Sequence, residues 1–219
     1  EPIVRPLQRF KWLKIAAILL IIPAAWSLYF FLNQLNYTTL SANNQVRTET
    51  LPDGSEVTLN SNSVISYPNK FDSKQRKIQL KKGDVFFNIT HDKTKPFIIE
   101  VDKITVQVIG TSFNIKHLNN QTEVIVETGI VRVSVDNQSV ELHPSEKVLI
   151  KNDTEKLVVE ESTDQLYKYY RTKMFVANST PLWRVVEILN EAYEANIVIE
   201  DSRLRNLTLT TTFKEEPLD

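Results

Sequence analysis

The fold is decided by the stretch Phe97-Ile98-Ile99-Glu100-Val101-Asp102-Lys103-Ile104-Thr105-Val106-Gln107-Val108-Ile109. On both sides of Asp102 and Lys103, apolar side chains alternate with polar ones. Such alternation is typical of half-buried β-strands, and the charged pair between the two runs suits a turn. We therefore expect two strands, at residues 97–101 and 104–109.

Similar short runs surround this stretch and continue the pattern without a helical period. They lie at residues 56–59, 77–80, 84–89, 113–116, 123–127, 131–135, 139–142 and 147–150. Residues 46–160 are thus predicted to form an all-β domain, sandwich-like or solenoid-like. All four glycines of the chain, Gly54, Gly83, Gly110 and Gly129, fall between these runs, and each is expected to supply a positive φ or a bulge.

An uncharged segment, residues 15–32, precedes the β domain. At about 1.5 Å per residue a helix of this length spans roughly 27 Å, close to the ~30 Å hydrocarbon core of a bilayer. A cleaved signal peptide and a buried core helix are the alternatives. The apolar run is long for a signal peptide and no small-x-small site follows it, so we expect a retained transmembrane helix.

Charge gives this helix an orientation. The basic residues Arg5, Arg9, Lys11 and Lys14 all precede it, which places residues 1–14 in the cytoplasm as the end of a cytoplasmic segment. The rest of the chain is then exported, beginning with a polar linker at residues 33–45.

Composition favours a bacterial periplasm for the exported part. The 219 residues include no cysteine, whereas exported eukaryotic domains of this size usually carry disulfides. The formal net charge is −1, which gives no sign of nucleic-acid binding.

After a charged and tyrosine-rich connector at residues 161–173, in which a short helix is expected, a second pattern begins. Residues 174–219 read as strand, helix, strand, strand. Residues 174–176 are expected to be extended, and Thr180 to cap a helix whose first position is Pro181. Strands are expected at 197–199 and 207–210, so this region is a small α/β module.

Several motifs make part of the chain recognisable, in this order and spacing: Thr50-Leu51-Pro52-Asp53-Gly54-Ser55-Glu56-Val57, Leu59-Asn60-Ser61-Asn62-Ser63, Lys82-Gly83-Asp84-Val85-Phe86-Phe87, Lys95-Pro96-Phe97, Val108-Ile109-Gly110-Thr111-Ser112-Phe113-Asn114-Ile115 and Glu127-Thr128-Gly129. Over residues 48–150 the chain resembles the periplasmic domain of the FecR family. The resemblance implies a single-pass inner-membrane regulator, an anti-sigma factor. Such proteins relay a signal from an outer-membrane TonB-dependent receptor to an extracytoplasmic-function sigma factor that controls nutrient or iron uptake genes.

Residues 174–219 resemble the incomplete start of the STN-like module of Bacteroidetes members of that family, a βαβ unit. The resemblance implies that a receptor's signalling domain binds here. An open sheet edge can accept a partner strand, which makes Thr208, Thr210 and Thr212 candidate contacts, together with Trp183. The alternatives are that this strand pairs only within its own sheet and that Trp183 belongs to the core.

One motif carries possible chemistry. Some FecR-like proteins cleave themselves at a Gly-Thr bond, where the Thr hydroxyl attacks the preceding carbonyl, and this chain offers Gly110-Thr111. A Thr hydroxyl is a suitable nucleophile, and Gly leaves the carbonyl sterically open. The alternative is a structural tight turn. We expect no other catalytic residues, and so no conventional enzyme.

Metal sites and cofactors are not expected either. The three histidines, His91, His117 and His143, lie far apart in sequence and lack metal-ligand spacing. Two functions remain open: the sigma-factor regulator just described, and a membrane-tethered β-rich binding or adhesion module without a regulatory role.

Overall fold

The structure is a computed structural model that describes residues 19–29, 37–151 and 156–214. It divides into two units, residues 1–38 and residues 39–219. In the first unit residues 19–29 are helical, while the remainder of the predicted span 15–32, and the basic segment before it, lie outside the described residues. Within the described ranges, no helix combines the length and the apolar character that crossing a membrane requires.

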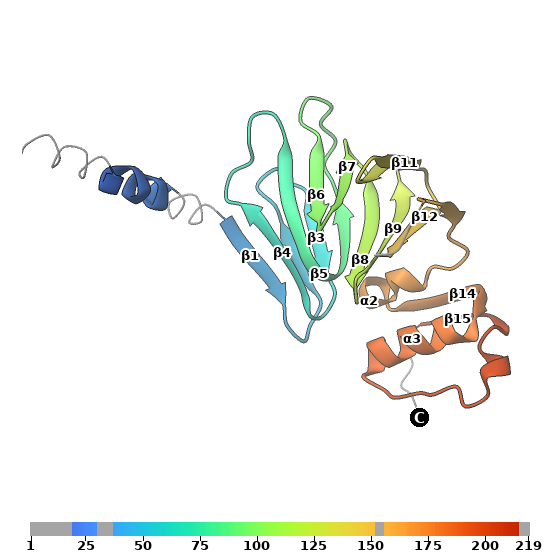
Figure 1. Cartoon of the computed structure of the whole chain (residues 1–219). Helices are drawn as coiled ribbons and strands as arrows, with labels where there is room; N and C mark the ends of the chain where they lie inside the picture. Colours follow the sequence, from blue (N-terminus) through green and yellow to red (C-terminus); the bar gives the residue numbers. More distant parts are fainter. Residues whose placement is uncertain (1–18, 30–36, 152–155, 215–219) are drawn as a thin grey trace, which may run out of the picture. The chain divides into compact units, whose positions relative to one another are not determined.

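The β domain consists of two sheets that share one long strand, β5 (Arg76–Asn88) (Figure 1). The first half of β5 pairs with β4 (Ser63–Pro68) and, in parallel, with β6 (Phe97–Val101). Its second half pairs antiparallel with β3 (Glu56–Leu59) and β8 (Ser112–Leu118). We call the two sheets sheet A and sheet B, after the first and second halves of β5.

The remaining strands extend the two sheets outward. Sheet A adds β1 (Tyr37–Ala42) next to β4, and β7 (Ile104–Val108), β10 (Val131–Val135) and β11 (Gln138–Leu142) beyond β6. Sheet B adds β2 (Arg47–Thr50) next to β3, and β9 (Gln121–Thr128), β12 (Glu146–Lys151) and β13 (Val159–Glu161) beyond β8.

Inward-facing side chains of both sheets form one apolar cluster. Ile78 and Phe97 of sheet A and Phe87 and Phe113 of sheet B are almost fully buried in it, and the rings of Phe87 and Phe113 stack with their centroids 5.2 Å apart. Alternate residues of each strand enter this cluster, as a half-buried strand requires. The prediction of a mainly β, sandwich-like domain is therefore confirmed.

Two sequence-based expectations for the β domain were wrong. Residues 37–42, taken as part of the polar linker 33–45, form strand β1, in which Leu40 and Ala42 are buried. Residues 77–80 and 84–89 were expected to be separate strands, but β5 runs through Lys81, Lys82 and Gly83 without a break. The strands at 97–101, 56–59 and 131–135 have the predicted bounds.

The glycines are required for different structural reasons. Gly83 has φ +103° at the point where β5 passes from sheet A to sheet B, and a Cβ there would lie only 2.5 Å from Cβ of Ser63. Gly54 and Gly129 also have positive φ. Gly110 does not. It is needed for space, because a Cβ would lie 2.5 Å from Cα of His91.

The C-terminal region is a small α/β module with its own core. A short helical turn, η1 (Leu166–Lys168), and α2 (Tyr169–Thr172) confirm the expected helix in the connector. They precede a two-stranded antiparallel sheet of β14 (Met174–Pro181) and β15 (Thr208–Lys214). Helix α3 (Leu182–Tyr193) packs on this sheet, and η2 (Ser202–Leu204) leads into β15 (Figure 1).

Two details of the module differ from the prediction. Pro181 is the N-cap of α3 and not its first helical residue, and no side chain caps the helix. Thr180 instead pairs with Leu209 in the sheet. Residues 197–199, predicted as a strand, have no regular secondary structure, because Ile197 hydrogen-bonds through its backbone to the side chain of Asn190.

Candidate functional site

The predicted partner-binding residues lie on the outer part of the module. Strand β15 pairs with β14 and with no other strand in the described part of the chain. Thr208, Thr210 and Thr212 on it are exposed, although the hydroxyl of Thr210 accepts a hydrogen bond from the Ser179 N–H at 2.9 Å. Trp183 is 40% exposed and therefore not a core residue. The described sheet thus leaves an edge for a partner strand.

Trp183 and the threonines lie at related positions. The backbone N–H of Trp183 donates to the carbonyl of Arg205 at 3.1 Å, and Thr208 pairs with Pro181. Both residues are therefore at the same end of the module, where α3 begins and β15 enters the sheet. Thr210 and Thr212 continue along β15 away from that end.

The Gly110-Thr111 bond lies between β7 and β8 and is held from both sides. The Ile109 carbonyl accepts hydrogen bonds from the Asp92 N–H at 3.0 Å and from Arg76 at 3.2 Å, and the Thr111 carbonyl accepts one from the Ile89 N–H at 2.9 Å. The Thr111 side chain is buried, and its hydroxyl has no hydrogen-bond partner among the described residues. A buried hydroxyl without a partner is uncommon.

Arg76 fixes the loops around this bond. The guanidinium is almost fully buried and forms an ion pair with Asp53 at 2.8 Å. It also donates to three backbone carbonyls, those of Lys95, Thr90 and Ile109, at 2.9, 2.8 and 3.2 Å. One side chain thereby ties the turn at Asp53 to the loops that flank Gly110.

A less expected feature is the contact between the module and the outer face of sheet B. This docking face is formed by side chains that alternate with the core residues of β3, β5, β8 and β9: Thr58, Asp84, Phe86, Asn114, Lys116, Glu123 and Glu127. Several ion pairs join it to the module. Lys116 pairs with Glu191 of α3 at 2.7 Å, and Arg184 pairs with Glu123 at 3.1 Å.

A third ion pair joins Arg171 of α2 to Glu127, and the Arg171 guanidinium lies 3.7 Å above the ring of Phe86. Burial alone would lower the pKa of Lys116. The nearby Glu191 and Glu187 carboxylates have the larger combined effect and raise that pKa above its usual value. The apolar clusters of the β domain and of the module are separate. Ion pairs and hydrogen bonds therefore join the two without a shared apolar core.

Under the module, three polar side chains form a hydrogen-bonded chain, in which Asp84 and Asn114 are buried. The Tyr170 hydroxyl donates to Oδ1 of Asn114 at 3.1 Å and to the Thr58 carbonyl at 3.3 Å, and the Asn114 amide donates to Oδ1 of Asp84 at 2.6 Å. Burial raises the pKa of the Asp84 carboxyl to about 7, against the lowering effect of Asn114 and Lys116. Sequence analysis missed this group, because Asp84 and Asn114 occupy positions that read as the solvent-facing side of their strands.

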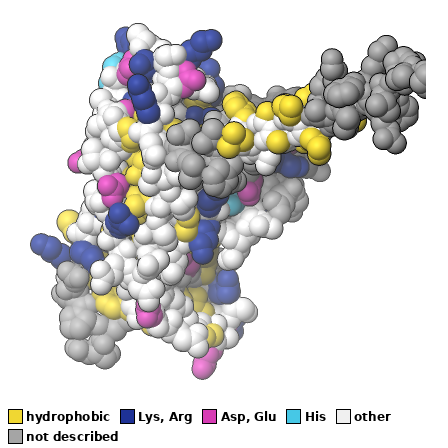
Figure 2. Space-filling view, turned by 90° about the vertical axis from the view of Figure 1, so that its left-hand side faces the viewer, with side chains coloured by type: hydrophobic (Ala, Val, Ile, Leu, Met, Phe, Trp, Pro, Cys, Tyr) yellow, Lys and Arg dark blue, Asp and Glu magenta, His cyan; other side chains and the backbone are white. Residues whose placement is uncertain are grey.

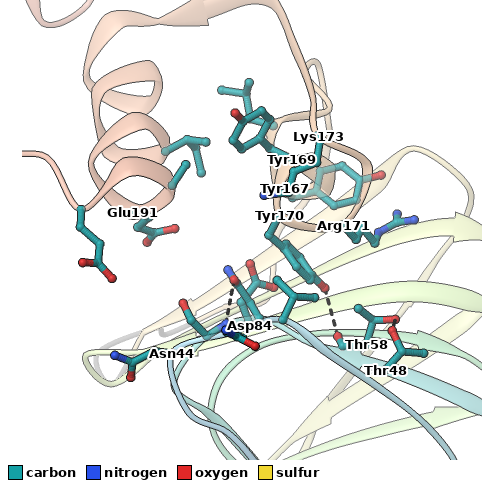
Figure 3. A pocket seen from close by; sticks show the side chains of 18 residues that line it. Asn44, Thr48, Thr58, Asp84, Tyr167, Tyr169, Tyr170, Arg171, Lys173 and Glu191 are labelled. Carbon is teal, nitrogen blue, oxygen red and sulfur yellow. Dashed lines mark hydrogen bonds between the residues drawn. The ribbon is translucent and has the colours of Figure 1, made fainter. Parts of the chain in front are cut away.

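A cavity of about 620 Å³ adjoins this chain of side chains (Figure 3). Its floor comes from the β2–β3 side of sheet B and from Asp84, and its other walls come from the tyrosines of η1 and α2 and from the end of α3. In Figure 3, Asp84 and Thr58 lie on the side of the β domain, and Tyr170 points its hydroxyl toward Thr58, while Tyr167 and Tyr169 lie farther out on the side of the module. Elsewhere on the surface, the face in Figure 2 carries interspersed acidic and basic side chains.

Known proteins are similar to this chain over the β domain and beyond it. Residues 37–132 match the family model described as FecR protein. Two crystal structures from Parabacteroides distasonis, each of a protein proposed to be an anti-sigma factor, are similar to 83% of this chain and to 86% of their own. The structure at 1.65 Å resolution has 29% identity and a TM-score of 0.69, and that at 2.50 Å has 28% and 0.67. No curated protein matches the sequence significantly.

Proposed function

We propose that this chain, whose residues 37–132 form a FecR domain, is part of a sigma-factor regulator of the anti-sigma type. The observation that carries the proposal is the similarity, at 29% identity over 83% of the chain, to a protein proposed to be an anti-sigma factor. This similarity extends over more residues than the β domain contains. It favours a regulator over a simple adhesion module.

The proposed arrangement is that of a single-pass protein of the bacterial inner membrane. Residues 15–32 cross the membrane, the basic N-terminal segment is cytoplasmic, and the β domain and module are periplasmic. The signalling domain of a TonB-dependent outer-membrane receptor binds the STN-like module, and the cytoplasmic partner is an extracytoplasmic-function sigma factor that controls nutrient or iron uptake genes. The open edge of β15 supports such a partner, because its unpaired backbone groups can accept a strand.

A pull-down with the full chain tests the receptor contact. We expect a TonB-dependent receptor's signalling domain to retain the chain, and the double substitution Thr208→Lys with Thr212→Lys to weaken binding about tenfold, because lysines at a sheet edge disfavour strand addition. Trp183→Ala is expected to weaken binding as well, since exposed aromatic residues often dominate interfaces.

The control is Thr50→Lys, which places a single lysine on β2, an edge strand of sheet B. It should leave retention unchanged. Retention that is equal for the double variant and the control would contradict binding at β15, and no retention of the unaltered chain would contradict the receptor relay.

We propose a second activity, self-cleavage at Gly110-Thr111. The Thr111 hydroxyl oxygen attacks the Gly110 carbonyl carbon, the C–N bond breaks, and the hydroxyl proton ends on the Thr111 amine. Water then hydrolyses the resulting ester, which gives a Gly110 carboxylate and restores the hydroxyl. The unpartnered Thr111 hydroxyl favours this proposal, since no hydrogen bond has to be broken before it attacks.

Replacing Thr111 by Ala removes the nucleophile and is expected to abolish the two fragments that end at Gly110 and begin at Thr111, as seen by gel and mass spectrometry. Thr111→Ser keeps a hydroxyl and should still give them. Fragments of unchanged yield in Thr111→Ala, or an unaltered chain that stays intact, would exclude self-cleavage.

A further inference from the structure

The cavity between the β domain and the module has the size of a ligand site. Its volume of about 620 Å³ falls within the roughly 300–1,000 Å³ typical of small-molecule pockets, which occur preferentially where two domains meet. It is separate from the edge of β15 and from the Gly110-Thr111 bond, and neither proposed activity uses it.

One carboxylate oxygen that is accessible from the cavity has no protein donor. Asp84, which is 7% exposed, lines the cavity. Its Oδ1 is bound by Asn114, while Oδ2 receives no hydrogen bond from the described residues. A carboxylate oxygen in such a mostly buried side chain gains stability when a donor reaches it. A molecule in the cavity can supply that donor.

The remaining lining indicates an uncharged ligand. The charges of its acidic and basic side chains nearly cancel. Two of these side chains are already paired, Arg171 with Glu127 and Glu191 with Lys116. Most of the other polar groups are neutral amides and hydroxyls: Asn44, Gln45, Asn60, Thr48, Thr58 and Ser61. Asp84 and Glu194 form no ion pair with the described residues, and Glu194 is exposed, so water screens its charge. A fixed anion would therefore be repelled by these two carboxylates, and a fixed cation would gain little from the screened one.

The opposite wall is apolar and aromatic. Leu166, Tyr169 and Ile188 are buried residues of the module that border the cavity. A ligand that fits both walls has hydroxyl groups on one side and C–H groups on the other. Because burial raises the pKa of Asp84 to about 7, its carboxyl is partly protonated near neutral pH. A hydroxyl can pair with either form, since it both donates and accepts, whereas an ammonium can only donate.

We propose that this cavity binds a small neutral polyol with an apolar face, of the chemical class of a monosaccharide, anchored by the Asp84 carboxyl. The ligand contacts both the β domain and the module, so its binding stabilises the docked arrangement. Nothing in this proposal depends on the receptor contact or on self-cleavage.

Saturation-transfer NMR on the full chain tests it, with glucose, galactose, mannose and N-acetylglucosamine as probes and with choline and inorganic phosphate as charged comparisons. We expect a saturable signal from at least one sugar and none from the charged probes. Asp84→Asn, which keeps the volume but removes the charge-assisted acceptor, should weaken that sugar about tenfold.

Ala192→Trp fills the cavity from α3 and should abolish the signal, while Asn137→Trp, in an exposed turn outside the lining, should not. Thermal unfolding of each variant establishes that it is folded. The proposal is overturned if no sugar gives a saturable signal, if choline or phosphate binds instead, or if Ala192→Trp and Asn137→Trp bind the sugar equally well.

Discussion

Replacing Arg76 by Met is expected to lower the free energy of unfolding by about 3–5 kcal/mol, the usual cost of removing one partner from a buried ion pair. The Met side chain fills similar space but offers no donor. The Asp53 carboxylate would lose its cation, and the carbonyls of Lys95, Thr90 and Ile109 would each lose a hydrogen bond. The loops that flank Gly110 would then be released together.

Urea unfolding followed by far-ultraviolet circular dichroism measures this effect, with Arg132→Met as the matched control. Arg132 pairs with Glu141 at 2.7 Å, but both side chains are about half exposed, so the control should change the free energy of unfolding by less than about 1 kcal/mol. Equal effects of the two substitutions would show that Arg76 does not hold the loops.

Replacing Gly83 by Ala is expected to cost about 4 kcal/mol or more, among the largest effects of single substitutions. Two causes add. The φ of +103° is unfavourable for any residue with a Cβ. The new Cβ would also lie 2.5 Å from Cβ of Ser63, whose own backbone cannot retreat without breaking the pairing of β4 with β5.

Gly54→Ala separates the two causes. Its φ of +81° carries a similar conformational cost, but the nearest atom to a new Cβ is the Thr90 hydroxyl at 3.9 Å. We expect a loss of about 1–2 kcal/mol there. If both variants unfold at the same urea concentration, the steric contact with Ser63 is unimportant and the bend in β5 tolerates a side chain.

The sequence was most informative where apolar and polar residues alternate over a whole strand. Residues 97–101 and 131–135 show this pattern and form β6 and β10 with the predicted bounds. Residues 37–42 have only Leu40 and Ala42 to bury, and their polar composition resembles a linker. Their strand depends on pairing with β4, a contact between distant residues that a local pattern does not reveal.

Lys81, Lys82 and Gly83 were misread for a related reason. A charged pair followed by Gly usually marks a turn, and here it marks the bend of a continuous strand. In the candidate site, too, a local sequence pattern does not reveal contacts between distant residues. Gly110, Thr111 and the residues of β15 stand out in sequence, whereas Asp84 and Asn114 do not, because only the module that covers them makes their positions interior.

The strand shared by the two sheets also has a mechanical consequence. The chain enters the β domain through β1 of sheet A, while the module rests on sheet B. Tension between these two points passes along the backbone of β5, which belongs to both sheets and is paired on both sides at Gln79 and over residues 85–88. A pull on the module is therefore transmitted across the sandwich as a rigid displacement, not absorbed by sliding of one sheet over the other.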